Sequence, residues 1–265
     1  MNIALASGRY APIRRSSYAY VTHFLFADVM LVSSKAGKSS LTELKRMLEK
    51  LASYTGLTIN PNKSIIFFSQ KCTRKEELKS IIGFTEGTFS SKYLGLPLSP
   101  TYLKPMHYSS LIDKCGSKLE GWSMHALSFS GRVELIKSVI HGIISYWIQS
   151  FHFPVTICNE VDRLCANFVW KGKMHTWAWD SLCRSKSGGG MGLRRAQGIN
   201  NVAKLKRFWN SCNSKSIWAR WLKDHYLKGR SLWEIKAQPM DSYVWKNIIA
   251  ARQTASAHMY LPRQC

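Results

Sequence analysis

The spacing of hydrophobic residues changes near residue 100. Before that point, short apolar runs alternate with amphipathic segments, and the first two runs, residues 22–27 and 29–33, are rich in aromatic and branched side chains. Such side chains suit a half-buried sheet. Asp28 stands between the two runs, so the pattern predicts a β-hairpin with a carboxylate at its turn.

Two helices are predicted in the same region. Ser40 and Glu43 have the spacing of a capping box before a periodic apolar face, and Gly56 is a suitable end for that helix. A second capping box, Thr73–Glu76, predicts a shorter helix that stops at Gly83. Residues 1–20 show no clear periodicity, and we expect a frayed N-terminus.

Three further segments of the first hundred residues have sheet or turn character. Residues 57–59 and 65–68 flank a turn at 60–62 and predict a second small sheet element. Residues 93–98 predict an apolar strand that is ended by proline. The first hundred residues therefore have a mixed α/β pattern.

After residue 100 the apolar period becomes helical. Residues 108–122, 133–147 and 157–169 each repeat apolar positions every 3.6 residues, with Ser130 as the expected cap of the second segment and Phe153-Pro154 as its break. Three amphipathic helices joined by short loops predict a small bundle.

The remaining residues begin with a glycine-rich stretch, 187–192. It lacks the spacing of a phosphate-binding P-loop and follows no clear strand, so a flexible joint is favoured over a phosphate cradle. The tail beyond it is basic and rich in tryptophan. Its aromatic residues could stack on single-stranded bases beside phosphate-neutralising cations, or they could form the core of small helices. We expect Trp218 and Trp221 to be core, and leave Trp233 and Trp245 open.

The charge balance narrows the choice of partner. Lys and Arg total 38 against 15 Asp and Glu, which gives a formal net charge of +23. Such an excess on a globular chain indicates a polyanion, with RNA or DNA as the leading candidate. A membrane surface is the alternative, but the basic residues are spread along the chain, so no membrane partner is expected.

Location and metal binding are less strongly marked. The chain has no apolar run near the ~20 residues of a membrane helix, and residues 1–6 are too short for a signal-peptide core, so we expect an intracellular protein. The seven cysteines include no C-x-x-C pair; Cys158, Cys165, His175 and Cys183 make a poor zinc site, and free thiols are expected.

Three segments, 22–33, 56–64 and 92–98, resemble in order and spacing the later palm motifs of reverse transcriptases from plant LINE-type (non-LTR) retrotransposons. In that family the hairpin reads Phe-Ala-Asp-Asp, and the paired acids work with a third Asp on an earlier strand to hold Mg²⁺. This chain has Phe26-Ala27-Asp28-Val29, so one acid of the pair is replaced or deleted. The resemblance implies Asp28 as the remnant of the catalytic and metal site, and RNA-templated DNA synthesis as the ancestral activity.

The sequence itself bears on whether that chemistry survives. Asp28 is the only acidic residue before Glu43, and two-metal catalysis needs several oxygen ligands to clamp ions about 3.5–4 Å apart. The segments that would carry the fingers and the first catalytic Asp are expected to lie before Met1. We therefore expect a truncated, catalytically inactive polymerase, with no productively bound Mg²⁺.

The resemblance also implies nucleic-acid contacts and a location. Lys63 belongs to a motif near the nucleotide and could steady a phosphate, although an exposed turn lysine is the alternative. The segment Lys92, Tyr93, Leu94 and Gly95 resembles a hairpin that grips the primer, and the helical bundle resembles the thumb. The implied phosphate contacts of the thumb and tail are Lys104, Lys114, Lys118, Arg132, Lys137, Lys204, Lys206 and Arg207. A nuclear location follows only from the family.

We therefore predict an α+β fold: a partial polymerase palm over residues 1–100, a helical thumb-like bundle over 101–186, and a Gly-rich joint with a basic, Trp-rich helical connector over 187–265. The predicted function is that of a truncated reverse transcriptase without activity. Two alternatives remain open, a non-catalytic basic nucleic-acid-binding protein and a decayed reading frame without function.

Overall fold

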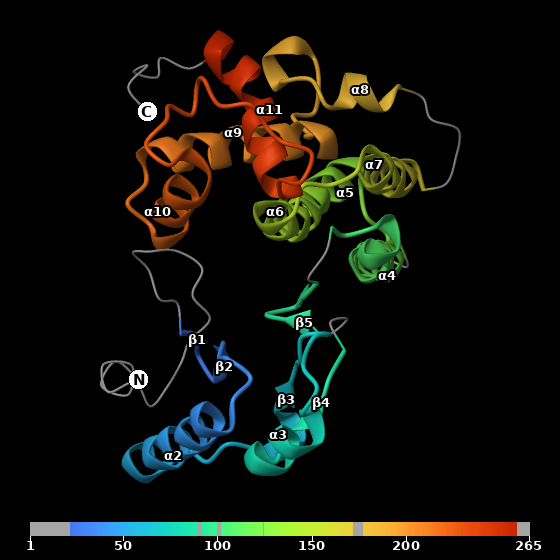
Figure 1. The fold of residues 1–265 in the computed structure, drawn as a ribbon. Helices are drawn as coiled ribbons and strands as arrows, with labels where there is room; N and C mark the ends of the chain where they lie inside the picture. The colour runs from blue at the N-terminus through green and yellow to red at the C-terminus, as the bar shows by residue number, and fades with distance from the viewer. Residues whose placement is uncertain (1–21, 89–91, 100–101, 124, 172–176, 259–265) are drawn as a thin grey trace. The chain divides into compact units, whose positions relative to one another are not determined.

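The computed structural model describes residues 22–88, 92–99, 102–123, 125–171 and 177–258 (Figure 1). The expected frayed segment, residues 1–20, and His175 of the considered zinc site lie outside these ranges. Within the described ranges the fold is α+β and mostly helical, and the strands there form three two-stranded sheets. The predicted fold class is confirmed. The chain divides into two compact units, Met1–Pro100 with Arg220–Lys228, and Thr101–Ala219 with Gly229–Cys265.

The first unit contains the predicted hairpin. Strand β1 (His23–Phe26) pairs antiparallel with β2 (Val29–Val32), and Ala27 and Asp28 form the turn. Ala27 has a φ of 49°, in the left-handed region that glycine favours, because a two-residue connection must reverse the chain with the twist of the strands. The hairpin prediction is confirmed.

Both predicted helices of the first unit form, but their starts differ from the prediction. Helix α2 (Lys38–Thr55) has Gly37 as its N-cap, so Ser40 lies inside the first turn, and helix α3 (Lys75–Ile82) has Arg74 as its N-cap without a side-chain cap. The capping-box assignments at Ser40 and Thr73 are therefore wrong. The predicted ends are confirmed, because Gly56 and Gly83 adopt the left-handed conformation that terminates a helix.

The core of the first unit lies between these two helices. Leu41 and Leu44 of α2 pack with Leu78 and Ile82 of α3, and Val32 of β2 joins this cluster. Apolar residues at helical spacing thus cover a common interior, as the periodicity predicts.

The other small sheets differ from the predicted ones. Residues 57–59 form no strand; the turn is instead a 3₁₀ helix, η1 (Pro61–Lys63), after which β3 (Ile65–Ile66) pairs in parallel with β4 (Thr85–Glu86). The single strand predicted over 93–98 is in fact a hairpin of β5 (Lys92–Tyr93) and β6 (Leu96–Pro97). Leu94 and Gly95 form its turn, and both have positive φ, as two-residue hairpin turns require.

The second unit is helical. Its elements are η2 (Pro105–Tyr108), α4 (Ser109–Ser123), α5 (Phe129–Leu135), the π-helical turn η3 (Ile136–Ile140), α6 (His141–Ser150), α7 (Val155–Trp170), α8 (Trp179–Leu182), η4 (Lys186–Gly188), α9 (Ala196–Asn213) and α11 (Tyr243–His258). Helix α10 (Ile217–Leu222) and the π-helical turn η5 (Lys223–Leu227) follow α9 in the chain, and residues 220–228 of this segment are grouped with the first unit. The three predicted bundle helices correspond to α4, the continuous run from α5 to α6, and α7.

One cap of this unit was predicted two residues too late. The run from α5 begins at Phe129, and the hydroxyl of Ser128 accepts a hydrogen bond from Gly131 N at 3.1 Å. Ser128, rather than Ser130, is therefore the N-cap. The predicted break at Phe153-Pro154 is confirmed, since α6 ends at Ser150 and α7 begins at Val155.

Helix α9 is central to the core of the second unit, since it contacts α6, α7 and α11. Aromatic side chains fill the interior: Tyr108 and Phe153 meet edge to face with ring centroids 5.1 Å apart, and Trp245 is buried. Trp218, expected in the core, is 37% exposed, so that expectation is wrong, whereas Trp221 is half-buried. No helix within the described ranges is both long and apolar enough to cross a membrane.

Candidate nucleic-acid interface

The carboxylate of the predicted catalytic remnant is exposed at the tip of the β1–β2 hairpin. Asp28 follows Phe24, Leu25 and Phe26, which are 54%, 66% and 62% exposed. One carboxylate supplies at most two oxygens, fewer than a Mg²⁺ pair requires. In the described part of the chain no three His, Cys, Asp or Glu residues are placed to hold a metal ion. The described side chains around Asp28 therefore do not supply the oxygen ligands of a catalytic magnesium pair.

The other predicted contacts of the first unit are also at its surface. Lys63 is exposed at the end of η1, where Asn60 Oδ1 accepts a hydrogen bond from Asn62 N at 2.9 Å and fixes the turn. Lys92 is exposed on β5, beside the half-buried Tyr93. Both lysines are accessible to a phosphate, and their assignment as nucleic-acid contacts stays a prediction.

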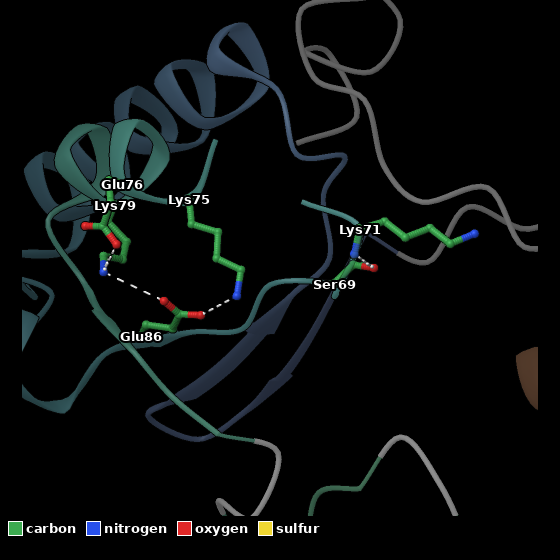
Figure 2. Close-up of polar contacts among 6 residues, drawn as sticks. All are labelled: Ser69, Lys71, Lys75, Glu76, Lys79 and Glu86. Atoms are coloured by element: carbon green, nitrogen blue, oxygen red, sulfur yellow. Dashed lines mark hydrogen bonds and ion pairs between the residues drawn. The ribbon is translucent and has the colours of Figure 1, made fainter. Parts of the chain in front are cut away.

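Several glutamates of the first unit form ion pairs within the protein. Figure 2 shows Glu86 of β4 between Lys75 and Lys79 of α3, with contacts of 2.9 Å and 3.7 Å from its two oxygens to the lysine nitrogens. Lys79 also contacts Glu76 at 2.7 Å, whereas the side chain of Lys71 points away from this group. The hydrogen bond from Lys75 and the nearby Lys79 charge hold the pKa of Glu86 below its usual value, so Glu86 stays ionised at neutral pH.

Four predicted lysines of the second unit are exposed to solvent. Lys114 and Lys118 lie one turn apart on α4, Lys104 precedes η2, and Lys206 lies on α9. Residues four apart on a helix share a face. Lys114 and Lys118 can therefore contact neighbouring phosphates of one strand.

Two predicted arginines instead donate hydrogen bonds inside the protein. Arg132 donates to the carbonyls of Val169 at 2.8 Å and Leu127 at 2.7 Å, and Arg207 donates to the carbonyl of Ile148. Burial lowers the pKa of Arg207 below its ordinary value. Val169 and Ile148 lie in the last turns of α7 and α6, where a carbonyl has no partner within its own helix, and the guanidinium groups supply one. The structure gives both arginines a packing role, which their sequence positions did not indicate.

The other predicted cations lie beside two half-buried histidines. Lys204 is near His152, while Lys137 lies near His141 together with Arg194. Burial, followed by the charges of Arg194 and Lys137, lowers the pKa of His141 to about 4, although a hydrogen bond to the Arg194 backbone opposes the shift. Burial, followed by Lys204 and Arg207, lowers the pKa of His152 to about 4. Both imidazoles are neutral at physiological pH.

The glycine-rich stretch, which was predicted to be a flexible joint, is a hydrogen-bonded turn. Met191 N donates to Leu182 O and Gly192 N to Arg184 O, each at 2.9 Å. A Cβ on Gly192, whose φ is 66°, would lie 3.8 Å from Lys186 Cγ and 3.9 Å from Lys137 Nζ. The turn therefore places Lys186 beside Lys137, although 49 positions separate them in the sequence. Lys186 and Arg194 were absent from the predicted contacts; their only sequence signal is that they flank the glycines.

We expect the two histidines to destabilise the protein in mild acid. The unfolded chain takes up protons near pH 6.5, whereas the folded histidines do so only near pH 4. The free energy of unfolding therefore keeps its full value above pH 6.5, where both histidines are neutral in the folded and the unfolded chain. It falls as the pH approaches 4, because only the unfolded chain takes up the protons. With allowance for partial exposure, the loss is about 1–2 kcal/mol per histidine.

Urea unfolding at pH 7.5, 6 and 5 tests this expectation. In a His141→Gln/His152→Gln variant, the free energy of unfolding should decline much less between pH 6.5 and 5 than in the original chain. An equal decline in the variant and the original chain would contradict the assignment.

Comparison with known proteins finds a distant relative of this chain. The chain is 28% identical over 160 residues, 57% of its length, to a protein from Arabidopsis thaliana that bears the name ribonuclease H protein. The matched region spans about a quarter of that relative, 26% of its length. No family model matches the chain. The chain is therefore similar to part of a larger protein that is named for a nucleic-acid enzyme.

Proposed function

We propose that this chain binds RNA or DNA through the basic surface of its helical unit, as a non-catalytic part of a non-LTR retrotransposon reverse transcriptase. The observation that carries the proposal is uncompensated positive charge. Lys and Arg outnumber Asp and Glu by 38 to 15, so 23 basic residues have no acidic residue in the sequence to balance their charge. A polyanion would relieve the remaining repulsion.

Two further observations support this assignment. The relative from Arabidopsis is named for an RNA-cleaving enzyme, which agrees with a nucleic-acid partner. The motif Phe26-Ala27-Asp28-Val29 occupies a β-hairpin, as the resemblance to reverse transcriptases requires. Asp28 has no acidic neighbour before Glu43 in the sequence, which favours binding over metal-dependent catalysis.

We expect binding to be steeply dependent on salt. Each phosphate neutralised by Lys or Arg adds a slope of about −0.9 to log K against log salt for a duplex, so even four contacts give about −3.6. Fluorescence anisotropy with a labelled RNA–DNA duplex measures this slope. The KCl concentration is varied between about 50 and 300 mM, where counterion release dominates the salt dependence. An affinity that does not change with salt, or no binding by folded protein, would overturn the proposal.

The non-catalytic part of the proposal needs a separate experiment. We expect the purified chain not to extend a DNA primer on an RNA template with Mg²⁺ and dNTPs. An Asp28→Ala variant is the control for contaminating polymerase. Extension by the original chain that the variant loses would show a working carboxylate site and would overturn the non-catalytic assignment, while leaving the binding assignment intact.

A further inference from the structure

Three cations of the second unit gather at the glycine-rich turn. Lys137 comes from η3, Lys186 from η4 and Arg194 from the segment just before α9. Lys137 Nζ and Lys186 Cγ both approach Gly192, and Arg194 and Lys137 both act on His141. We call Lys137, Lys186 and Arg194 the turn cluster. Its members converge only in the folded protein.

The turn cluster has no counter-charge of its own in the described structure. Within the described ranges, no carboxylate lies within 4.0 Å of the side-chain nitrogens of these three residues. The neighbouring Arg195 differs, because it contacts Asp180 at 3.0 Å and Asp162 at 3.6 Å. Like charges held together without an anion repel each other, so an incoming anion gains more here than at an isolated lysine.

His141 lies beside the turn cluster and is affected by its charge. Its pKa is lowered to about 4, first by burial and then by the charges of Arg194 and Lys137. A protonated imidazole at this place would add a further positive charge to the turn cluster. The histidine is therefore a neutral packing residue at pH 7, and the anion site consists of the three permanent cations.

The hydrogen bonds of the turn indicate which kind of phosphate can bind. The amides of Gly188, Gly189 and Gly190 donate to oxygens of Ser185 and Lys186, and those of Met191 and Gly192 donate to Leu182 and Arg184. These five amides are occupied, so the turn does not form the amide nest that cradles a terminal phosphate. Binding must come from long side chains, which suit successive phosphodiesters along a strand.

We propose that Lys137, Lys186 and Arg194 form a subsite for the phosphodiester backbone of nucleic acid, and that the glycine-rich turn exists to hold two of them against the third. This inference rests on the proposed function and specifies where the backbone is held. Lys137 is half-buried, so its ammonium group is held in place by its surroundings. Lys186 and Arg194 are exposed at the turn and can contact the phosphates of the same strand.

The test is duplex binding by a Lys137→Gln/Lys186→Gln/Arg194→Gln variant, measured by anisotropy against salt. Loss of three phosphate contacts should reduce the salt slope by about 2.7 and weaken binding on the order of 100-fold near 0.15 M salt. The matched control, Lys35→Gln/Lys45→Gln/Arg74→Gln, removes the same charge from exposed positions of the first unit. It should change the slope by less than about one phosphate contact.

A charge-preserving variant, Lys137→Arg/Lys186→Arg/Arg194→Lys, guards against a loss that comes from misfolding. It should retain near-original binding, and all variants should have the thermal midpoint of the original chain. Equal losses in the turn-cluster variant and its matched control would overturn the subsite but not nucleic-acid binding. If the original chain itself does not bind the duplex, the proposed function is wrong, and the subsite is wrong with it.

Discussion

A Gly190→Ala substitution is expected to lower the free energy of unfolding by about 3 kcal/mol or more, because the added Cβ would overlap backbone atoms of the turn. Gly190 is buried, and a Cβ there would lie 2.3 Å from Arg184 O and 2.6 Å from Arg184 C. A flexible side chain could move aside, but a carbonyl cannot do so without breaking the neighbouring hydrogen bonds. One of these joins Gly192 N to Arg184 O.

Gly198→Ala is the matched control. Gly198 lies inside α9, and a Cβ there meets nothing within 4 Å. Alanine is the better helix former, so this variant should gain up to about 1 kcal/mol. Urea unfolding followed by tryptophan fluorescence measures both changes. Similar stabilities for the two variants would show that the turn is not packed as described.

Losing Gly190 should also weaken nucleic-acid binding, because the turn positions Lys186 and Arg194. That second effect separates the turn from an ordinary packing site. A variant that stays folded at low temperature and still binds duplex with the original salt slope would count against the turn cluster.

An Asn200→Ala substitution is the second large effect that we expect, a loss of about 2–4 kcal/mol. Asn200 of α9 is fully buried; its Oδ1 accepts a hydrogen bond from Phe153 N at 3.1 Å, and its Nδ2 donates to Phe153 O at 3.0 Å. Both peptide groups lie in the chain break between α6 and α7, where no helical partner exists for them. Alanine would leave a buried donor and acceptor unsatisfied.

Two companion variants make this expectation specific. Asn200→Asp keeps the size of the side chain but removes the amide donor and brings a carboxylate toward Phe153 O, so it should cost at least as much as alanine. Asn213→Ala removes an exposed asparagine that donates to Trp209 O at 3.1 Å, and it should cost less than about 0.5 kcal/mol. Unfolding in urea orders the three variants, and a small loss for Asn200→Ala would contradict the buried pairing.

Predictions from sequence succeeded where the signal is local. The hairpin around Asp28 is readable because two apolar runs and a short connection leave few other arrangements. Gly56 and Gly83 end helices because the left-handed conformation suits glycine far better than other residues. The positions of α4, α6 and α7 follow from an apolar repeat of 3.6 residues, which keeps one helix face against the core.

Where the sequence offered competing local signals, packing determined which structure formed. Ser40 and Glu43 have the spacing of a cap, yet α2 starts at Lys38, and Glu43 is held by Arg46 at 2.8 Å. Helix α2 begins earlier than predicted, and Gly37 has the extended backbone conformation that an N-cap residue adopts. Trp218 and Trp221 share a helical spacing, but only the environment of each decides its burial.

We could predict four features from the sequence: the α+β class, the hairpin that carries Asp28, the helical repeat after residue 100 and the excess of positive charge. These follow from residue type, short-range spacing and composition. The neighbours of each cation could be learned only from the tertiary structure. It assigned Arg132 and Arg207 to backbone carbonyls and brought Lys137, Lys186 and Arg194 together from separate segments. A charge's partner depends on its neighbours in space, and one-dimensional spacing does not contain that information.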